Sequence, residues 1–201
     1  MVALQQAILD FVMTPEVYAE YPEHIDGWIF NTSHTFPGYV DPPADPSVSH
    51  SMLIRANFED PAGTNPHLNT NGDQTNHALR PTGLYLAPGS IATVTVPNSL
   101  VGQGYYVRVG SHEWDLGIRP KFYRLDRITK KFPIDASNIE VFNPFGGAIS
   151  ILVPYQSDSG IVEISITNGV ESPFFSLKSF YETPNFNTEL SKPGPWAVFE
   201  T

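Results

Sequence analysis

The stretch NPFGGAISILVP, residues 143–154, decides the fold class of this chain. A turn signal with two adjacent glycines, Gly146 and Gly147, is followed at once by small and branched apolar residues. Such a run predicts a buried β-strand, and glycines before it predict a tight turn that needs positive φ angles. A phosphate loop would need a lysine after the glycines and then a helix, and neither follows here. We therefore expect Gly146 and Gly147 to bend the chain into an inner strand.

The sequence on either side of this stretch repeats the same pattern. Short segments rich in branched or aromatic residues are each bounded by Gly, Pro, Asn or Ser, which is typical of strands. These segments are 83–87, 91–97, 105–110, 122–125, 138–142, 148–154, 161–166 and 174–177. Residues 161–166 alternate well enough to bury one face, whereas 148–153 are more apolar and favour a central strand. The pattern predicts a mainly β fold, a two-sheet antiparallel β-sandwich.

The N-terminus differs, because its apolar residues are spaced as one face of a helix. This spacing predicts a helix over 2–13, and Thr14-Pro15-Glu16 supplies an N-cap for a second short helix over 15–21. We divide the chain into a helical N-terminal segment (1–35), a Pro- and Asn-rich extended region with one strand at 51–58 (36–80), a sandwich core (81–178) and a connector (179–201). We expect the connector, which is rich in aromatic residues and proline, to lead to a further element.

Composition excludes several classes of protein. The formal charge of −10 and the pI near 4.9 argue against a nucleic-acid partner, which requires clustered Lys and Arg. The chain has no cysteine, so it has no disulfide framework, and no apolar run is long enough to span a bilayer. The first residues lack the basic region and cleavage site of a signal peptide.

One basic strip stands out against this acidic background. Six of the eleven basic residues fall within 119–131, namely Arg119, Lys121, Arg124, Arg127, Lys130 and Lys131. The strip is either a site for an acidic glycan or a solvated strand and loop that balances the acidic surface.

Candidate metal sites are few. The pair His112-Glu113 lacks the second histidine of a zinc-protease helix, because Leu116 stands in its place. We therefore expect no catalytic residue and no cofactor in these 201 residues. A weak calcium candidate is formed by Asn69, Asn71 and Asp73, whose alternating side chains offer oxygen ligands. The Asn-Gly pair within it equally predicts a polar turn.

Aromatic residues offer a candidate sugar-binding platform. Stacked rings are a common way to hold a glycan, and the candidate contacts are Tyr105, Tyr106, Trp114, Arg119 and Lys121, with Trp28 and Trp196 as further aromatics. The alternative is that these rings belong to the core, and the sequence does not separate the two.

Several motifs, in order, resemble the non-catalytic front part of enhancin-like, mucin-degrading zinc metallopeptidases, peptidase family M60. They are PTGLYLAPGSIATVTVP (81–97), YYVRVGSH (105–112), RLDRITKKFPI (124–134), NPFGGAISILVP (143–154) and SPFFSL (172–177). FPG at 36–38 and KPGPWAVFET at 192–201 resemble the family's flanking sequence, so the resemblance covers about residues 36–201.

The resemblance implies a β-sandwich that precedes a catalytic domain, where the His-Glu-x-x-His motif binds zinc. It also implies action on O-glycosylated proteins outside the cell or at its surface, in organisms that are often bacterial. Two functions stay open at this point. One is a non-catalytic domain that scaffolds its own C-terminal catalytic domain, and the other is a stand-alone glycan-binding or adhesion module.

Overall fold

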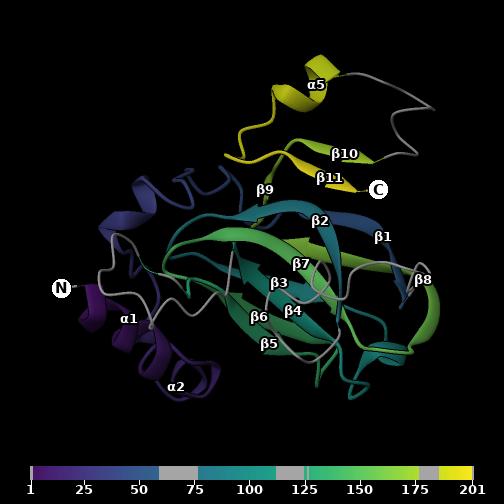
Figure 1. Cartoon of the computed structure of the whole chain (residues 1–201), viewed down its shortest axis with the longest axis horizontal. Coiled ribbons are helices and arrows are strands. Elements are labelled where there is room, and N and C mark those ends of the chain that lie inside the picture. Colours follow the sequence, from purple (N-terminus) through teal and green to yellow (C-terminus); the bar gives the residue numbers. More distant parts are fainter. Residues whose placement is uncertain (1, 59–76, 112–124, 126, 177–185, 201) are drawn as a thin grey trace.

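The computed structural model describes residues 2–58, 77–111, 125, 127–176 and 186–200. This part of the chain is mainly β, as predicted, with a few short helices (Figure 1). The helices are α1 (Val2–Phe11), α2 (Pro15–Glu20), the 3-10 turns η1 (Pro22–His24), η2 (Asn31–His34) and η3 (Asn98–Leu100), and α5 (Phe186–Leu190). The strands are β1 (Ser49–Asn57), β2 (Ala78–Leu86), β3 (Ile91–Thr95), β4 (Tyr106–Gly110), β5 (Lys130–Pro133), β6 (Asn138–Phe142), β7 (Gly147–Val153), β8 (Asp158–Thr167), β9 (Val170–Glu171), β10 (Phe174–Ser176) and β11 (Val198–Glu200).

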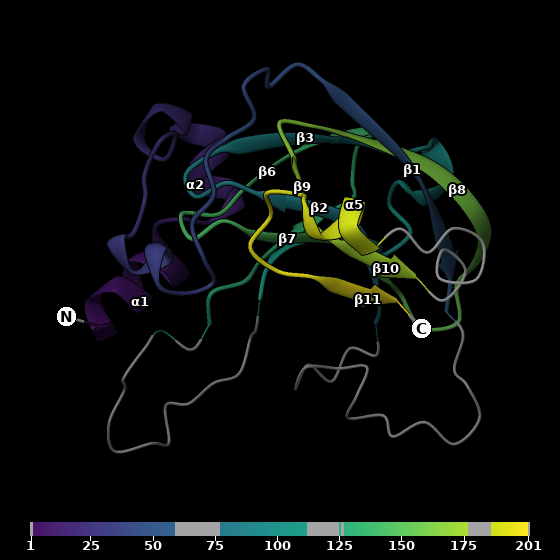
Figure 2. The same cartoon turned by 90° about the horizontal axis from the view of Figure 1, so that it is seen from above.

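The strands form two antiparallel sheets, which confirms the predicted architecture. One is four-stranded, in the order β1-β8-β3-β6, and the other is five-stranded, in the order β5-β4-β7-β2-β9. Figure 2 shows the two sheets as layers, with α1 and α2 at one end of the sandwich. A separate parallel pair, β10 with β11, lies beside the five-stranded sheet, where β11 contacts β2.

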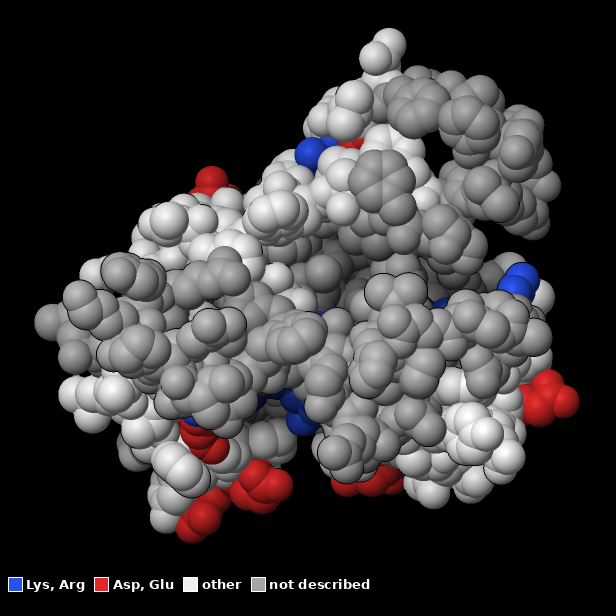
Figure 3. All heavy atoms as spheres, viewed as in Figure 1, with Lys and Arg blue, Asp and Glu red and all other residues white. Residues whose placement is uncertain are grey.

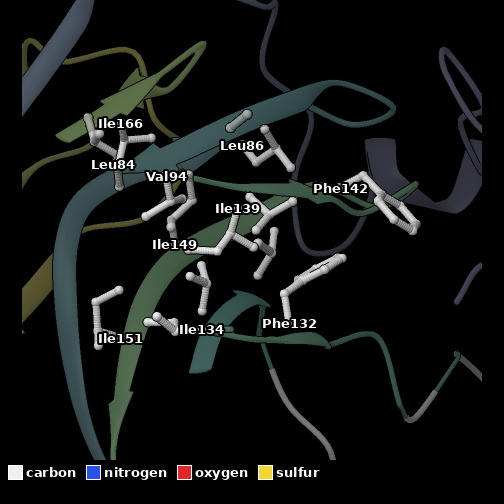
Figure 4. Close-up of a cluster of buried hydrophobic side chains, with 14 of the residues drawn as sticks. Leu84, Leu86, Val94, Phe132, Ile134, Ile139, Phe142, Ile149, Ile151 and Ile166 are labelled. Atoms are coloured by element: carbon white, nitrogen blue, oxygen red, sulfur yellow. The ribbon is translucent and has the colours of Figure 1, made fainter. Parts of the chain in front are cut away.

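The core fills the space between the sheets (Figure 4). Ile149 and Ile151 of β7, Val94 of β3 and Ile166 of β8 belong to this core cluster, and all four side chains are almost fully buried. Strand β8 alternates as predicted, because its even-numbered residues from 162 to 166 face the core and Ile161 faces solvent. Strand β7 is the middle strand of its sheet and is buried along nearly its whole length.

The NPFGG turn does what the sequence predicts, which is to bend the chain into this inner strand. Gly146 and Gly147 have φ angles of +65° and +138°, a region that favours glycine. A Cβ on Gly147 would lie 2.4 Å from the Cα of Gly110 on the neighbouring strand β4. The glycines are therefore needed for close backbone packing.

Asn143 fixes the same turn from inside the protein. Its side chain has no exposure to solvent, and its Nδ2 donates to the carbonyl oxygens of Val109 and Ile128, both at 2.9 Å. Its Oδ1 accepts a hydrogen bond from the Phe145 amide at 3.0 Å. One buried amide thus ties the turn to β4 and to the segment before β5.

The two N-terminal helices form as predicted and close one end of the sandwich. The Thr14 hydroxyl caps α2 by accepting a hydrogen bond from the Val17 amide, and Pro15 occupies the first turn. Tyr18 of α2 packs on Phe142 of β6 with 4.5 Å between ring centroids. The helical segment is thus joined to the edge strand of the four-stranded sheet.

The strand predicted at 51–58 is confirmed as β1, which pairs along its length with β8 and adds a strand from the segment 36–80 to the sandwich. The structure also contains elements that the sequence did not reveal. Strand β5, helix α5 and strand β11 were not predicted. The predicted strand 122–125 lies outside the described residues except for Leu125, which is buried and belongs to no strand.

Candidate functional site

Most of the ligand residues predicted from the sequence lie outside the described part of the chain. This applies to the calcium candidates Asn69, Asn71 and Asp73 and to the glycan candidates Trp114, Arg119 and Lys121. Among the residues that are described, no group of three or more His, Cys, Asp or Glu side chains is placed to hold a metal ion. No helix in that same part is long and apolar enough to cross a membrane. The calcium and glycan sites at those positions stay predictions.

Tyr105 belongs to the core. Only 1% of it is exposed, and its hydroxyl donates to the carbonyl oxygen of Ala56 at 2.7 Å and lies 2.9 Å from Ser159 Oγ. Nearby, the Arg80 guanidinium donates to the carbonyl oxygens of Arg55 and Asn57. These contacts join strand β1 of one sheet to the other sheet. The ring of Tyr105 is therefore a structural element and is not available to stack on a sugar.

Tyr106, by contrast, points to the outer face of the five-stranded sheet and is partly exposed. The His77 ring meets it edge-on, with 5.6 Å between centroids and an interplanar angle of 81°. His77 is held in turn by a 3.3 Å contact between its Nε2 and the Gly104 carbonyl oxygen. Of the two candidate contacts Tyr105 and Tyr106, only Tyr106 offers a ring at the surface, and the further aromatics Trp28 and Trp196 are 46% and 50% exposed.

Two residues of the basic strip, Arg127 and Lys130, bind helix α1 in the structure. Arg127 Nη2 lies 3.0 Å from Asp10 Oδ2 of α1, and Gln6 of the same helix exchanges hydrogen bonds with the Arg127 backbone. Lys130 Nζ donates to the carbonyl oxygen of Leu9, in the last turn of α1. A cation at a helix C-terminus is favourable because it complements the helix dipole. Arg127 and Lys130 therefore fasten α1 to the sandwich.

Lys130 differs from an ordinary surface lysine. Only 9% of it is exposed, and burial lowers its pKa from 10.5 to about 8, while the nearby carboxylates of Asp10 and Glu16 act in the opposite direction. Neither the acidic-glycan interpretation nor the solvated-strand interpretation fits this residue. Lys130 is a buried side chain that donates a hydrogen bond to a carbonyl oxygen at the C-terminal end of α1.

A half-exposed aromatic cluster forms where two distant segments meet, and we call it the aromatic corner. It consists of His34, Phe36, Tyr39 and Trp196. The Trp196 ring meets Phe36 edge-on at 6.2 Å, and its Nε1 donates to the Pro37 carbonyl oxygen. The His34 and Tyr39 rings stack with 4.6 Å between centroids.

The aromatic corner unites the two flanking motifs that the sequence singled out, FPG at 36–38 and KPGPW at 192–196. Gly38 has a φ of +126°, and a Cβ there would lie 3.0 Å from Pro195 Cβ, so only glycine fits against the C-terminal segment. The sequence reasoning did not bring these motifs together. Their shared Pro-Gly-aromatic composition was the available signal.

Surface charge does not mark a site on the face shown in Figure 3. Acidic side chains lie at separate points there, mostly along the lower edge, and do not gather in one patch.

Comparison with known proteins identifies the family. The model for the N-terminal domain of M60-like peptidases matches residues 59–167, more than half of the chain. A TRPM8 channel-associated factor homolog of Xenopus laevis is 31% identical over 139 residues, which are 69% of this chain and 14% of that protein. TRPM8 channel-associated factor 2 of Mus musculus is 30% identical over 157 residues, 77% of this chain and 16% of that protein. The chain thus spans about a sixth or less of these vertebrate relatives.

Solved structures agree on the fold. The IMPa metallopeptidase in complex with T-antigen superposes with a TM-score of 0.56 at 14% identity, over 88% of this chain and 18% of that chain. IMPa from Pseudomonas aeruginosa in complex with an O-glycopeptide gives a TM-score of 0.51 at 11% identity, with the same coverage. At these identities the likeness concerns the fold alone, and it agrees with the family match. The chain belongs to the family of N-terminal domains of M60-like peptidases.

Proposed function

We propose that this chain is the non-catalytic N-terminal domain of a zinc metallopeptidase that acts on O-glycosylated, mucin-like proteins outside the cell or at its surface. The family match carries the proposal, because residues 59–167 take in strands β2 to β8, which form most of the sandwich. In this role the domain scaffolds the catalytic domain and helps to shape its substrate cleft.

The chemistry of the chain supports a scaffolding role. The sequence has no His-Glu-x-x-His motif, so the zinc ligands and the general base belong to the catalytic domain. Three buried polar side chains among the described residues have structural roles: Asn143 holds the NPFGG turn, Lys130 holds α1, and Tyr105 joins the two sheets. A rigid sandwich of this kind can position a neighbouring domain because its core resists deformation.

The substrate class is supported by the structural relatives. IMPa is described in complex with T-antigen and with an O-glycopeptide, and it shares this fold over 88% of the chain. We extend that substrate class to the protein of which this domain is part. The same relationship supports an extracellular or surface location.

Cleavage of a mucin tests the proposal. The chain is expressed together with the coding sequence that follows it, and a matched protein lacks residues 36–201. We expect the longer protein to cleave mucin and to lose this activity with a zinc chelator, and we expect the deletion to cut the rate severely. A longer protein that leaves mucin intact in the presence of zinc would disprove the proposed function.

A second candidate is a stand-alone glycan-binding or adhesion module. The partly exposed ring of Tyr106 on the outer sheet face favours it, since stacking on aromatic rings is a usual way to hold sugars. A glycan array probed with this chain, and with its Tyr106→Ala and Trp114→Ala variants, separates the candidates. Binding that both variants abolish supports the module, whereas an empty array rules it out.

A further inference from the structure

The aromatic corner is held in place by the body of the domain. Tyr85, a buried residue of β2, donates its hydroxyl to the Gly38 carbonyl oxygen at 2.8 Å. On the other segment, the Gly194 amide donates to the Glu171 carbonyl oxygen of β9 at 2.9 Å. Phe36 packs against the main core beneath Trp196. The exposed rings therefore sit on a fixed base.

Two of these rings keep a large exposed area despite that support. Trp196 is 50% exposed and Tyr39 is 38% exposed. The indole N–H of Trp196 already has its partner in the Pro37 carbonyl, so the part of Trp196 that faces solvent is apolar. Fixed, half-exposed Trp and Tyr rings are the side chains that most often dominate protein interfaces, because they bury much area at little cost in entropy.

The rim of the aromatic corner is acidic. The nearby carboxylate of Asp41, which is itself exposed, raises the pKa of the Tyr39 hydroxyl. The chain as a whole carries a formal charge of −10. A partner for this surface would therefore present an apolar pocket for the rings and a basic or hydrogen-bonding rim.

The position of the aromatic corner in the sequence indicates which partner binds there, namely the domain that follows. Trp196 comes two residues before β11, the last described element, and the family places this domain ahead of a peptidase domain. The part that follows is thus tethered beside the corner. Tethering raises the effective concentration to about the millimolar range, so a small apolar contact suffices for stable docking.

We propose that the aromatic corner is the surface on which the following peptidase domain docks, with Trp196 and Tyr39 as its anchors. This inference rests on the proposed function, because it takes the following domain from the family. It goes further in assigning the contact to one surface and two side chains. Docking there would fix the peptidase domain at the end of the sandwich where residues 34–40 and 194–196 meet.

Hydrogen exchange measured by mass spectrometry tests the proposal. Exchange in peptides that span 34–41 and 190–197 is compared between the 201-residue chain and the same chain with its following coding sequence. We expect exchange at least about tenfold slower at the corner in the longer protein. The variant Tyr39→Ala in the longer protein should reverse this protection, and Trp196→Phe should weaken it. The matched control Tyr155→Ala, which removes another ring that is 52% exposed, should leave it unchanged.

Equal exchange at the corner in the two proteins overturns the docking proposal, even if the longer protein cleaves mucin. Protection without any peptidase activity supports docking and refutes the proposed function instead. Slower exchange in the 201-residue chain alone as its concentration rises would assign the corner to a second copy of the chain and would also overturn the proposal.

Discussion

Replacing Asn143 by alanine tests whether one buried amide holds the central turn. The change removes two hydrogen bonds of 2.9 Å to the carbonyl oxygens of Val109 and Ile128 and one of 3.0 Å from the Phe145 amide. All three partner residues are at most 1% exposed, so the freed groups gain no contact with bulk water. Each bond of this kind contributes about 1–1.5 kcal/mol, and the variant should lose about 3–5 kcal/mol of unfolding free energy.

Urea unfolding followed by tryptophan fluorescence measures this loss. For a domain of this size the loss corresponds to a midpoint lower by about 2 M urea, a large share of a typical stability of about 5–15 kcal/mol. Asn138→Ala is the matched control, because Asn138 is exposed and accepts one hydrogen bond, from Thr95 Oγ1 at 2.8 Å. It should cost less than about 1 kcal/mol. If both variants unfold at the same urea concentration, the assignment of Asn143 as the anchor of the turn is wrong.

Three further predictions use the same unfolding assay. Gly147→Ala places a Cβ 2.4 Å from Gly110 Cα and should lower the free energy of unfolding by about 3 kcal/mol or more. The control Gly102→Ala also has a positive φ but no atom within 4 Å of the new Cβ, so it should cost about 1 kcal/mol. Equal losses in the two variants would contradict the close-packing argument. Tyr105→Phe should cost about 1–2 kcal/mol, because its hydroxyl bonds Ala56 O and Ser159 Oγ, and no loss would contradict its joining role. The pKa of Lys130 is about 8 in the folded chain against 10.5 for an ordinary lysine, so the unfolded chain binds the proton more tightly. The free energy of unfolding should therefore rise between pH 8 and 9.5, by up to about 1.4 kcal/mol per pH unit. The Lys130→Met variant should lack this rise, and an equal rise in the variant would refute the assignment of Lys130 as a buried lysine.

Local sequence patterns were sufficient for most strands of the two sheets and for the NPFGG turn. The alternation of 161–166 and the apolar run after Gly147 depend on neighbours along the chain, so they predicted strand β8 and the central strand β7 correctly. The same holds for the capping signal at Thr14. Strand β5 was missed because its sequence, KKFP, carries two lysines and a proline, and its pairing with β4 decides its conformation.

Contacts between distant residues could not be derived in this way. Lys130 looked like one member of a solvated basic strip, yet its partner, the Leu9 carbonyl, lies 121 residues earlier in the chain. The bond between Trp196 and Pro37 likewise joins residues that are 159 positions apart. Composition marked both motifs of the aromatic corner, but only the tertiary fold brings them together.

The most direct test of the central claim is a mucin-cleavage assay on the isolated 201-residue chain with zinc supplied. If the chain is a scaffold whose reactive groups lie in another domain, the mucin stays intact and the chain retains no stoichiometric zinc after dialysis. Zinc-dependent cleavage by the isolated chain would contradict the account.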